Sequence, residues 1–526
     1  MTTELIEIAE DSTKGSFILV GGTVIATAIS ALTSIFIARF LGPENYGLYS
    51  LSLVVPQILF LITDFGIGEG IIKFSIEARA KKQTNLGIKL IKYCLLIRIV
   101  ASLILFIILF MLSDQVAEIV FQRPELGFFI KISSVTVVFH SLYLTSVYAY
   151  IGFDKTVHSS LITQIQSVAK ALSSIILLLL GFSILGAVIG YVLGFMIGGI
   201  AGIISLLAYF KKHNKTVNSE RITNNLKKLI TYGAPLYFSI LMIGFMPQYM
   251  DILSALFVSN LNIGNFKATS NFMILLTIVA QQVTTALLPS FTKLNNASIK
   301  ERNSFFNASH KFTTLVTIPL TFLMIIFSNE IVQLAYGSTF TNAGFYLAIY
   351  SFIYILTGIG YLNIPSLFNG TGKTIETLKM NIITFLIVLT ISPITTSSYG
   401  IVGLILTLLF AQTIGSLYGV YRAKKTLNLS IDKKNIPKIY LIAVLSIIPT
   451  VLVAANFTSI PKMAIGAIIY LFSYITLIPL TNIINEKENE LLTRSVEKIK
   501  ILSIIKPVLK YQNKISKLTK KDKKIN

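Results

Sequence analysis

Five ionisable residues lie inside long apolar stretches of this sequence: Arg98, Lys170, His140, Asp64 and Asp251. An ionised side chain near the centre of a bilayer costs about 3 kcal/mol or more unless it faces water or a partner, so each is a candidate functional residue. In the N-terminal half, three potential cations outnumber the nearby Asp64. This predicts a net positive cavity that binds an anionic phosphate or pyrophosphate group, because Arg holds such oxygens bidentately and Lys acts as a point charge.

Other readings of the same residues stay open. Asp64 and Arg98 could form a structural ion pair, and His140 could be a satisfied core residue. Asp64 and Asp251 are candidates for coupling or gating. Lys131, Lys267 and Lys311 lie near the ends of apolar stretches, where Lys side chains are expected to snorkel towards water.

Polar residues also recur at helical spacing, which places each set on one face of a helix. The sets are Thr23, Thr27, Ser30 and Ser34; Thr163, Ser167, Lys170 and Ser174; and Ser270, Thr277, Gln281 and Thr284. Each set predicts either the lining of a polar cavity or close helix packing, since small and hydroxyl residues serve both purposes in membranes. The mid-depth Lys170 favours the cavity for the second set.

The sequence contains no motif that supports a catalytic site or a metal site. The segment NGTGKT at 369–374 resembles a phosphate loop, but that motif needs a glycine where Leu367 stands. A single cysteine, Cys94, excludes disulfides within the chain, and the four histidines show no metal-binding spacing. We therefore predict no catalytic residue, no metal and no cofactor.

The composition sets the fold class. The 526 residues are 54% hydrophobic and only 13% charged, and the mean hydropathy is +0.75, which is too apolar for a soluble protein. A membrane-spanning helix needs about 20 apolar residues. Fourteen candidate spans follow: 16–38, 47–67, 90–112, 126–153, 161–180, 185–210, 232–258, 266–289, 305–327, 344–367, 380–394, 400–421, 439–454 and 463–484.

Basic residues predict the orientation. Most of the 45 Lys and Arg residues fall on one side if the N-terminus is cytoplasmic, as expected for the positive-inside rule. An even number of spans returns the C-terminus to the cytoplasm. The basic tail after residue 484 is either a solvated cytoplasmic tail or a segment that binds anionic lipid headgroups.

Turn chemistry and a weak repeat predict the internal organisation. Gly42 and Pro43 should end the first helix. The stretch ARFLGPENYGLYSLS aligns with VSNLNIGNFKATSNF, with Leu41 on Leu261 and Tyr46 on Phe266. Six spans separate the two stretches, which predicts two six-helix lobes of the same orientation plus two C-terminal helices.

The predicted parts, by residue range, are a cytoplasmic N-terminal segment (1–14), an N-lobe (15–210), a cytoplasmic linker (211–230), a C-lobe (231–421), a loop with helices 13 and 14 (422–484) and a basic cytoplasmic tail (485–526). Two flexible points are also expected. Pro235 and Pro247 predict a kinked or interrupted seventh helix, and the Gly66–Gly70 run predicts a flexure after Asp64.

These segments carry a resemblance. ARFLGPENYGLYSLS, DFGIGEGIIKF, LNIGNFKATSNF, AYGSTFTNAG and NGTGKT resemble segments of the polysaccharide and lipid-linked oligosaccharide flippases of the multidrug/oligosaccharidyl-lipid/polysaccharide exporter superfamily. The resemblance covers roughly residues 14–422. The chain departs from the family pattern at Asn265 and Phe266, where a Gly-Tyr-Tyr type turn is usual.

The resemblance implies two six-helix lobes around a central cleft, with alternating access to the two sides of the membrane. The implied cargo is an oligosaccharide on a polyprenyl phosphate or pyrophosphate, moved from the cytoplasmic to the outer leaflet of the cell membrane for surface polysaccharide or glycoprotein assembly. Implied partners are membrane lipids and glycan polymerase or transferase proteins. If an ion gradient supplies the energy, the coupling ion would be H⁺ or Na⁺.

Two alternatives remain. The first is a multidrug/cation antiporter of the same superfamily, which usually has a carboxylate in the first helix. This chain has none between Gly15 and Arg39. The second is a membrane glycosyltransferase or polymerase, which would need a sizeable outer loop with acidic residues, and the expected outer loops are short.

Overall fold

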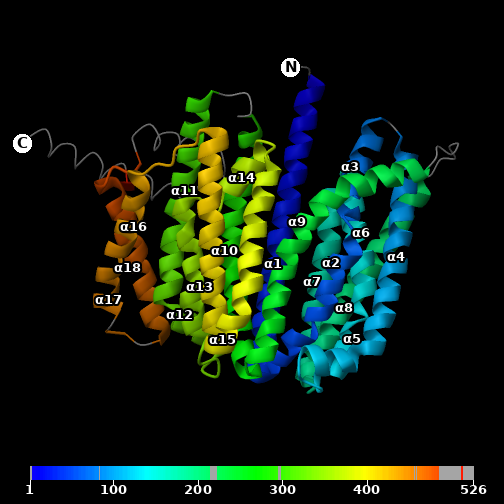
Figure 1. Ribbon diagram of the computed structural model, residues 1–526, viewed down its shortest axis with the longest axis horizontal. Helices are drawn as coiled ribbons and strands as arrows, with labels where there is room; N and C mark the ends of the chain where they lie inside the picture. The colour runs from blue at the N-terminus through cyan, green and yellow to red at the C-terminus, as the bar shows by residue number, and fades with distance from the viewer. Residues whose placement is uncertain are drawn as a thin grey trace, which may run out of the picture. The chain divides into compact units, whose positions relative to one another are not determined.

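The computed structural model describes the backbone of residues 3–81, 83–213, 222–293, 298–454, 456–457, 459–484 and 511–512. It describes the side chains of these residues except 3–18, 20, 222–236, 238–240, 275, 278–293 and 459. Helices dominate this part of the chain, and no strand occurs in it (Figure 1). The all-α prediction is therefore confirmed.

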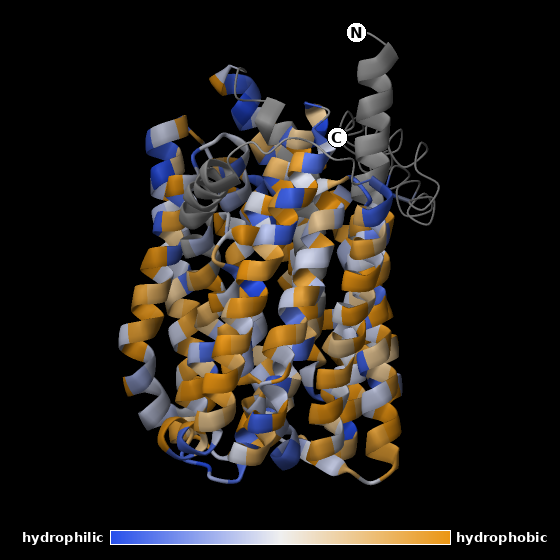
Figure 2. Cartoon of the chain, turned by 90° about the vertical axis from the view of Figure 1, so that its right-hand side faces the viewer, coloured by the Kyte–Doolittle hydropathy of each residue, from blue (hydrophilic) through white to orange (hydrophobic). Residues whose placement is uncertain are grey.

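Long apolar helices confirm a multi-pass membrane protein. Within the described residues, nine helices are long and apolar enough to cross a membrane, or ten if one bent pair counts as a span. In Figure 2, apolar residues fill the middle stretches of the helices and hydrophilic residues gather near their ends. The count of fourteen spans stays a prediction.

Two of these helical stretches are too long for one crossing. Gly21–Ala80 has 60 residues and Thr374–Leu427 has 54, whereas about 20 suffice for a bilayer. Each contains a glycine with non-helical backbone angles: Gly42 has φ 73° and ψ 168°, and Gly400 has φ 57° and ψ −138°. Because a positive φ is cheap for glycine alone, these residues mark where the chain can turn back. The predicted helix end at Gly42 is confirmed.

The contacts divide the chain into two compact units. Unit 1 comprises residues 1–271, 335–342 and 385–407. Its complete helices are α1 (Thr3–Ser52), α2 (Val54–Asp64), α3 (Ile67–Ala80), α4 (Thr84–Gln115), the π-helix Val116–Val120, α5 (Leu126–Ser133), α6 (Thr136–Gly152), α7 (Thr156–Leu179), α8 (Ser183–His213) and α9 (Ile222–Phe257).

Unit 2 comprises residues 272–334, 343–384 and 408–526. Its complete helices are α11 (Ile299–Ile326), α13 (Ala343–Ser351), the 3₁₀-helix Phe352–Ile359, α14 (Asn363–Gly370), α16 (Asn435–Leu445), α17 (Ile447–Ala454) and α18 (Ser459–Leu480). Three helices contribute to both units: α10 (Asn260–Lys293), α12 (Ser328–Tyr336) and α15 (Thr374–Leu427). The predicted lobe boundaries stay predictions, and much of the linker and nearly all of the tail lie outside the described residues.

The two flexible points expected from the sequence differ in outcome. The helix break after Asp64 is confirmed, because Phe65 and Gly66 both have positive φ, at 46° and 70°. The seventh helix was expected to be kinked or interrupted, and of these two forms the interruption is wrong, since α9 is one helix across Pro235 and Pro247. Figure 1 shows α9 curving along its length, which agrees with the kinked form. A membrane helix tolerates proline because neighbouring groups satisfy the freed carbonyls.

A row of glycines on α8 fixes its packing against α7. A Cβ on Gly190 would lie 2.2 Å from Ser174 Oγ, and one on Gly194 would lie 2.6 Å from Lys170 Cβ. Two helices can approach this closely only where the side chain is a hydrogen atom. The hydroxyl stripe of the fifth predicted span therefore serves helix packing at Ser174.

The two repeat segments lie against each other within unit 1. A Cβ on Gly264 would lie 1.7 Å from the carbonyl oxygen of Pro43, and one on Gly47 would lie 2.3 Å from that of Asn260. Arg123 holds the same region, because its Nη2 donates to the carbonyl of Val258 at 2.7 Å. The segments that the sequence aligns thus form one close backbone contact.

Candidate functional site

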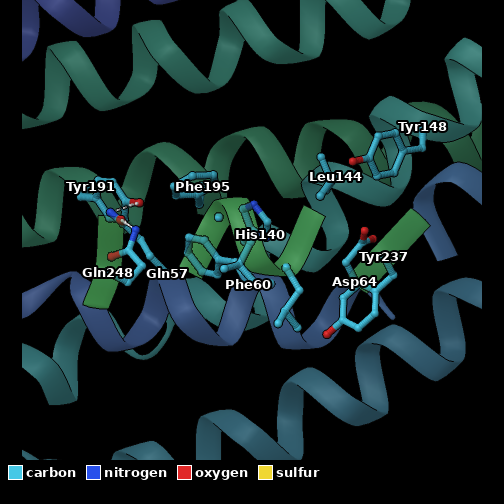
Figure 3. A pocket seen from close by; sticks show the side chains of 13 residues that line it. Gln57, Phe60, Asp64, His140, Leu144, Tyr148, Tyr191, Phe195, Tyr237 and Gln248 are labelled. Atoms are coloured by element: carbon cyan, nitrogen blue, oxygen red, sulfur yellow. Dashed lines mark hydrogen bonds between the residues drawn. The ribbon is translucent and has the colours of Figure 1, made fainter. Parts of the chain in front are cut away.

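A cavity of about 370 Å³ lies among four helices of unit 1 (Figure 3). Its size falls in the range of small-molecule sites. The lining residues are Gln57, Phe60, Leu61 and Asp64 of α2, His140, Leu144 and Tyr148 of α6, Tyr191 and Phe195 of α8, and Tyr237, Leu241, Gly244 and Gln248 of α9.

Helical periodicity explains why these residues meet. The lining positions recur at i, i+3, i+4 and i+7 on α2, at i, i+4 and i+8 on α6, and at i, i+4, i+7 and i+11 on α9. Such spacing keeps one face of each helix towards the cavity. At Gly244 the two helices α9 and α2 come close, since a Cβ there would lie 2.7 Å from Leu61 Cδ2.

One end of the cavity carries neutral polar groups. Gln248 Nε2 donates to Gln57 Oε1 at 3.0 Å, and Gln57 Nε2 donates to the hydroxyl of Tyr191 at 3.5 Å. Figure 3 shows these three side chains together at one end. This amide chain orients both Gln side chains.

The middle of the cavity is aromatic. The rings of Phe60 and His140 stack with centroids 3.8 Å apart and planes 5° apart. Phe195 stands edge-on to both, at 5.6 Å from Phe60 and 5.3 Å from His140. Among the described residues, His140 Nδ1 is buried without a hydrogen-bond partner. His140 therefore lines the cavity as a stacked ring.

The other end contains the charge. Asp64, Tyr148 and Tyr237 lie together there in Figure 3. Asp64 Oδ1 lies 3.2 Å from Arg98 Nη2, and the Asp64 side chain is 12% exposed whereas that of Arg98 is fully buried. The ion pair left open by the sequence is therefore present, and Arg98 does not line the cavity.

The Arg98 guanidinium is poorly satisfied. Within the described part of the chain, its Nε, Nη1 and Nη2 atoms have no hydrogen-bond partner, although Asp64 neutralises the charge. Buried donors without acceptors destabilise a fold. The pair is therefore an incompletely hydrogen-bonded ion pair beside the cavity.

Lys170 lies behind the cavity lining. Its Nζ is 5.3 Å from the centroid of the Tyr191 ring, in cation–π geometry, and Tyr191 itself lines the cavity. Of the five ionisable residues proposed from the sequence, Asp64 and His140 line this cavity. Headgroup binding by Arg98, Lys170 and His140 stays a prediction.

Asp251 lies away from the cavity and has a partner. Its side chain is 4% exposed and forms an ion pair with Lys267 of α10. The expectation that Lys267 snorkels is wrong, because a buried carboxylate within reach stabilises the ammonium more than the membrane surface does. Gating by Asp251 stays a prediction.

The hydroxyl residues do not line this cavity. Thr23 Oγ1 and Thr27 Oγ1 donate to the carbonyls of Leu19 and Thr23 on their own helix. Thr163 Oγ1 accepts from the hydroxyl of Tyr143 at 3.4 Å, and Ser167 Oγ donates to Gln166 Oε1 at 3.3 Å.

The remaining members of the three sets are placed as follows. Ser30 and Ser34 are half-buried on α1, Ser270 Oγ donates to the carbonyl of Phe266, Thr277 bonds with Tyr354 in unit 2, and the side chains of Gln281 and Thr284 lie outside the described residues. Their roles in lining a central cleft stay predictions.

Sequence reasoning missed the neutral half of the site. Five lining residues carry no charge and therefore cannot be found from buried charges in the sequence: Gln57, Phe60, Tyr191, Phe195 and Gln248. A signal existed, because Gln57 and Gln248 are amides inside apolar spans and Gln57 lies seven residues before Asp64, on the same helical face.

Comparison with known proteins adds a family and a fold. A family model described as polysaccharide biosynthesis protein matches residues 12–295. No curated protein sequence matches the chain. The lipid II flippase MurJ, in an inward closed conformation, shares the fold with a TM-score of 0.70 at 19% identity, over 88% of this chain and 99% of that one.

Two transporters of the MOP superfamily also share the fold. An inward-facing multidrug resistance MATE family transporter matches with a TM-score of 0.64 at 14% identity, over 76% of this chain and 94% of that one. A transporter from Pyrococcus furiosus matches with a TM-score of 0.56 at 13% identity, over 79% of this chain and 94% of that one. The resemblance stated from the sequence motifs is confirmed.

Proposed function

This chain belongs to the polysaccharide biosynthesis protein family, and on that premise we propose that it is a lipid-linked oligosaccharide flippase. It carries an oligosaccharide on a polyprenyl phosphate or pyrophosphate from the cytoplasmic to the outer leaflet. The product serves surface polysaccharide or glycoprotein assembly. The observation that carries the proposal is the family match over residues 12–295, joined to the fold shared with a lipid II flippase.

The cavity of unit 1 supports the proposal. It lies among apolar helices and offers aromatic rings, amides and hydroxyls, which are groups that bind a polar cargo inside a membrane. The lipid tail would remain in the bilayer while the polar part enters the protein.

Alternating access needs backbone points that can move. The glycines with positive φ at Gly42 and Gly400 and the break at Phe65–Gly66 supply such points. The close contact of Gly47 and Gly264 would close one end of unit 1. An H⁺ or Na⁺ gradient, or consumption of the product outside, would drive the cycle.

A multidrug/cation antiporter is the second candidate. The MATE-like fold and the presence of Asp64 in the cavity lining favour it. Against it, Arg98 neutralises Asp64, so an organic cation would find little net negative charge there. A glycosyltransferase or polymerase gains no support, because the named transporters and flippase share this fold over most of its length.

The cellular setting is part of the proposal. Both termini would lie in the cytoplasm, as the distribution of Lys and Arg predicts, and the protein would lie in the plasma or inner membrane. Glycan polymerase or transferase proteins would act on the delivered cargo.

Deletion of the gene tests the proposal. We expect the fully built lipid-linked oligosaccharide to accumulate on the inner leaflet while surface glycan falls, as measured by mass spectrometry of lipid extracts and surface labelling. Expression of the intact chain should reverse both changes. Unchanged glycan pools together with new sensitivity to cationic dyes would establish the antiporter instead.

A further inference from the structure

The cavity lining has three zones that follow one another along α2. Gln57, Gln248 and Tyr191 form an amide end, Phe60, His140 and Phe195 form an aromatic centre, and Asp64, Tyr148 and Tyr237 form the opposite end (Figure 3). We call this three-zone cavity the slot. A ligand that fills it must be polar at both ends and present an apolar face between them.

The aromatic centre suits a ring with C–H bonds on one face. Phe60 and His140 stack on each other and Phe195 meets them edge-on, so the three rings support one another. The π-face of an aromatic ring is negative and attracts the slightly positive hydrogens of a C–H group. A pyranose sugar presents such a face, because its axial C–H bonds lie on one side and its hydroxyls project from the rim.

The ends suit hydroxyl groups. Gln57 is held by Gln248 and Tyr191, and an amide both donates and accepts. The phenol groups of Tyr148 and Tyr237 at the other end can also do both. Sugar hydroxyls need donors and acceptors of this mixed kind.

The charge of the lining decides which sugars fit. The lining contains one ionised side chain, the acceptor Asp64, whose partner Arg98 is fully buried behind it. Lys170 is outside the lining, with its Nζ 5.3 Å from the centroid of the Tyr191 ring. Asp64 is paired with Arg98, so the described lining is close to neutral and offers a carboxylate or phosphate no unpaired cation in exchange for its lost water, which is unfavourable.

We infer that the slot is a glycan subsite that takes an uncharged sugar residue of the cargo, with its apolar face against an outer ring surface of the aromatic centre. The phosphate or pyrophosphate of the carrier then binds outside the slot. The inference rests on the proposed flippase function and adds to it the class of sugar that the cavity accepts.

The chain contains no tryptophan, so a single introduced tryptophan reports on one place. Phe195→Trp puts it at the centre of the slot. The matched control is Phe128→Trp on α5, where the ring is 57% exposed and outside the slot. Each full-length variant is placed in lipid nanodiscs and titrated with methyl β-glucoside, glucuronate or pyrophosphate at constant ionic strength.

We expect methyl β-glucoside to change the emission of Phe195→Trp with saturation and to leave that of Phe128→Trp unchanged. Glucuronate should bind about tenfold more weakly, since its carboxylate loses water and finds no unpaired cation in the described lining. Adding Gln57→Leu to the reporter should weaken methyl β-glucoside binding about fivefold to tenfold, because the sugar loses one hydrogen-bonding group.

Two results would overturn the inference: saturable binding of glucuronate or pyrophosphate in preference to methyl β-glucoside, or equal responses of the two tryptophan reporters. If Phe195→Trp does not purify as a monodisperse protein, Leu144→Trp on α6 replaces it and faces the same outcomes. Flipping of lipid-linked oligosaccharide by the intact chain, measured separately, distinguishes the two proposals. If lipid-linked oligosaccharide is flipped but the slot tryptophan does not respond to methyl β-glucoside, the subsite alone is refuted. If no flipping occurs, the flippase function is refuted.

Discussion

Buried polar groups are arranged differently in the two units. In unit 1, the Arg98–Asp64 pair lies beside a cavity, and the Arg98 nitrogens have no hydrogen bond within the described residues. In unit 2, α11 carries buried residues that are bonded into the fold. Lys311 Nζ donates to the carbonyl of Ile483 at 3.1 Å, and His310 Nε2 donates to that of Gly358 at 3.1 Å.

This difference distinguishes buried polar groups that are expected to act in transport from those that only stabilise the fold. Unit 2 uses its polar groups to fasten α11, the 3₁₀-helix 352–359 and the C-terminal helices. Tyr440 of α16 accepts from Gly358 N at 2.9 Å and donates to the carbonyl of Ile355. Among the described residues, unit 2 also contains buried polar atoms without a hydrogen-bond partner, one of them His310 Nδ1, but only in unit 1 do such atoms belong to an ion pair at the described cavity. An unsatisfied buried group of this kind calls for a functional explanation. Transport should therefore depend on the unit 1 group, and stability alone on the unit 2 group.

The largest expected effect is that of Arg98→Ala. It leaves the Asp64 carboxylate without its counterion, and breaking a buried pair in this way costs about 3–5 kcal/mol. We expect a lower melting temperature and less folded protein in the membrane, measured by thermal melting and by blotting.

The double variant Arg98→Ala with Asp64→Ala sharpens this prediction. It removes both charges, so we expect protein level to recover while surface glycan stays low. Recovery of both would place the Arg98–Asp64 pair in the same structural class as the groups of unit 2. Wild-type stability of Arg98→Ala alone would refute the pairing.

Lys311→Met tests the other side of the comparison. The carbonyl of Ile483 loses its charged donor, and an unsatisfied buried acceptor costs about 1–3 kcal/mol. We expect thermal stability to fall and transport per folded molecule to stay unchanged, measured as surface glycan normalised to protein level. A loss of transport without a loss of stability would show that unit 2 also contains a charged residue that takes part in transport.

Lys170→Met should show the opposite pattern, with a smaller effect on stability. It removes a cation–π contact worth about 0.5–2 kcal/mol and keeps the aliphatic stem against Gly194. Surface glycan should fall more than protein level. The control is Lys131→Met, because Lys131 Nζ lies 4.8 Å from the Phe110 ring centroid outside the cavity. Equal effects of the two substitutions would remove Lys170 from the site.

The smallest effect concerns acid stability of unit 2. Burial disfavours the ionised form of Asp432, but hydrogen bonds from the backbone and side chain of Asn435 and from Lys434 N outweigh burial and hold its pKa below the ordinary 3.8. A lowered folded pKa stabilises the fold above pH 3.8, and this contribution is lost as the pH falls through the folded value.

Asp432→Asn should therefore lower stability slightly near pH 6 and flatten the loss of stability below about pH 4. Thermal melting between pH 3 and pH 6 measures both. If the variant loses stability below about pH 4 as steeply as the unaltered protein, Asp432 does not contribute to that loss.

Periodicity and composition predicted the fold well. Apolar length predicted the multi-pass helical protein, and the Gly42–Pro43 turn and the flexure after Asp64 follow from local chain chemistry. Lys267 and Lys311 were expected to snorkel because they lie near the ends of predicted spans. In the structure they bind Asp251 and the carbonyl of Ile483 instead. Those partners lie 16 and 172 residues away and become neighbours only on folding.

The site was predicted only in part. Buried charge marked Asp64, Arg98 and His140, and two of them line the cavity. The amides of Gln57 and Gln248 meet across 191 residues of chain, and no local pattern tells which faces of α2 and α9 turn to each other. The cavity is therefore formed by the packing of the helices, which no local sequence pattern predicts.

The most direct test of the flippase function uses the purified chain in proteoliposomes that contain a lipid-linked oligosaccharide. A membrane-impermeant oxidant such as periodate reports the fraction of sugar on the outer leaflet over time. The flippase function predicts that the whole pool becomes accessible with protein present, whereas about half stays protected in protein-free vesicles. Protection of the same half in both preparations, with exchange of a cationic dye in the protein-containing vesicles, would contradict it.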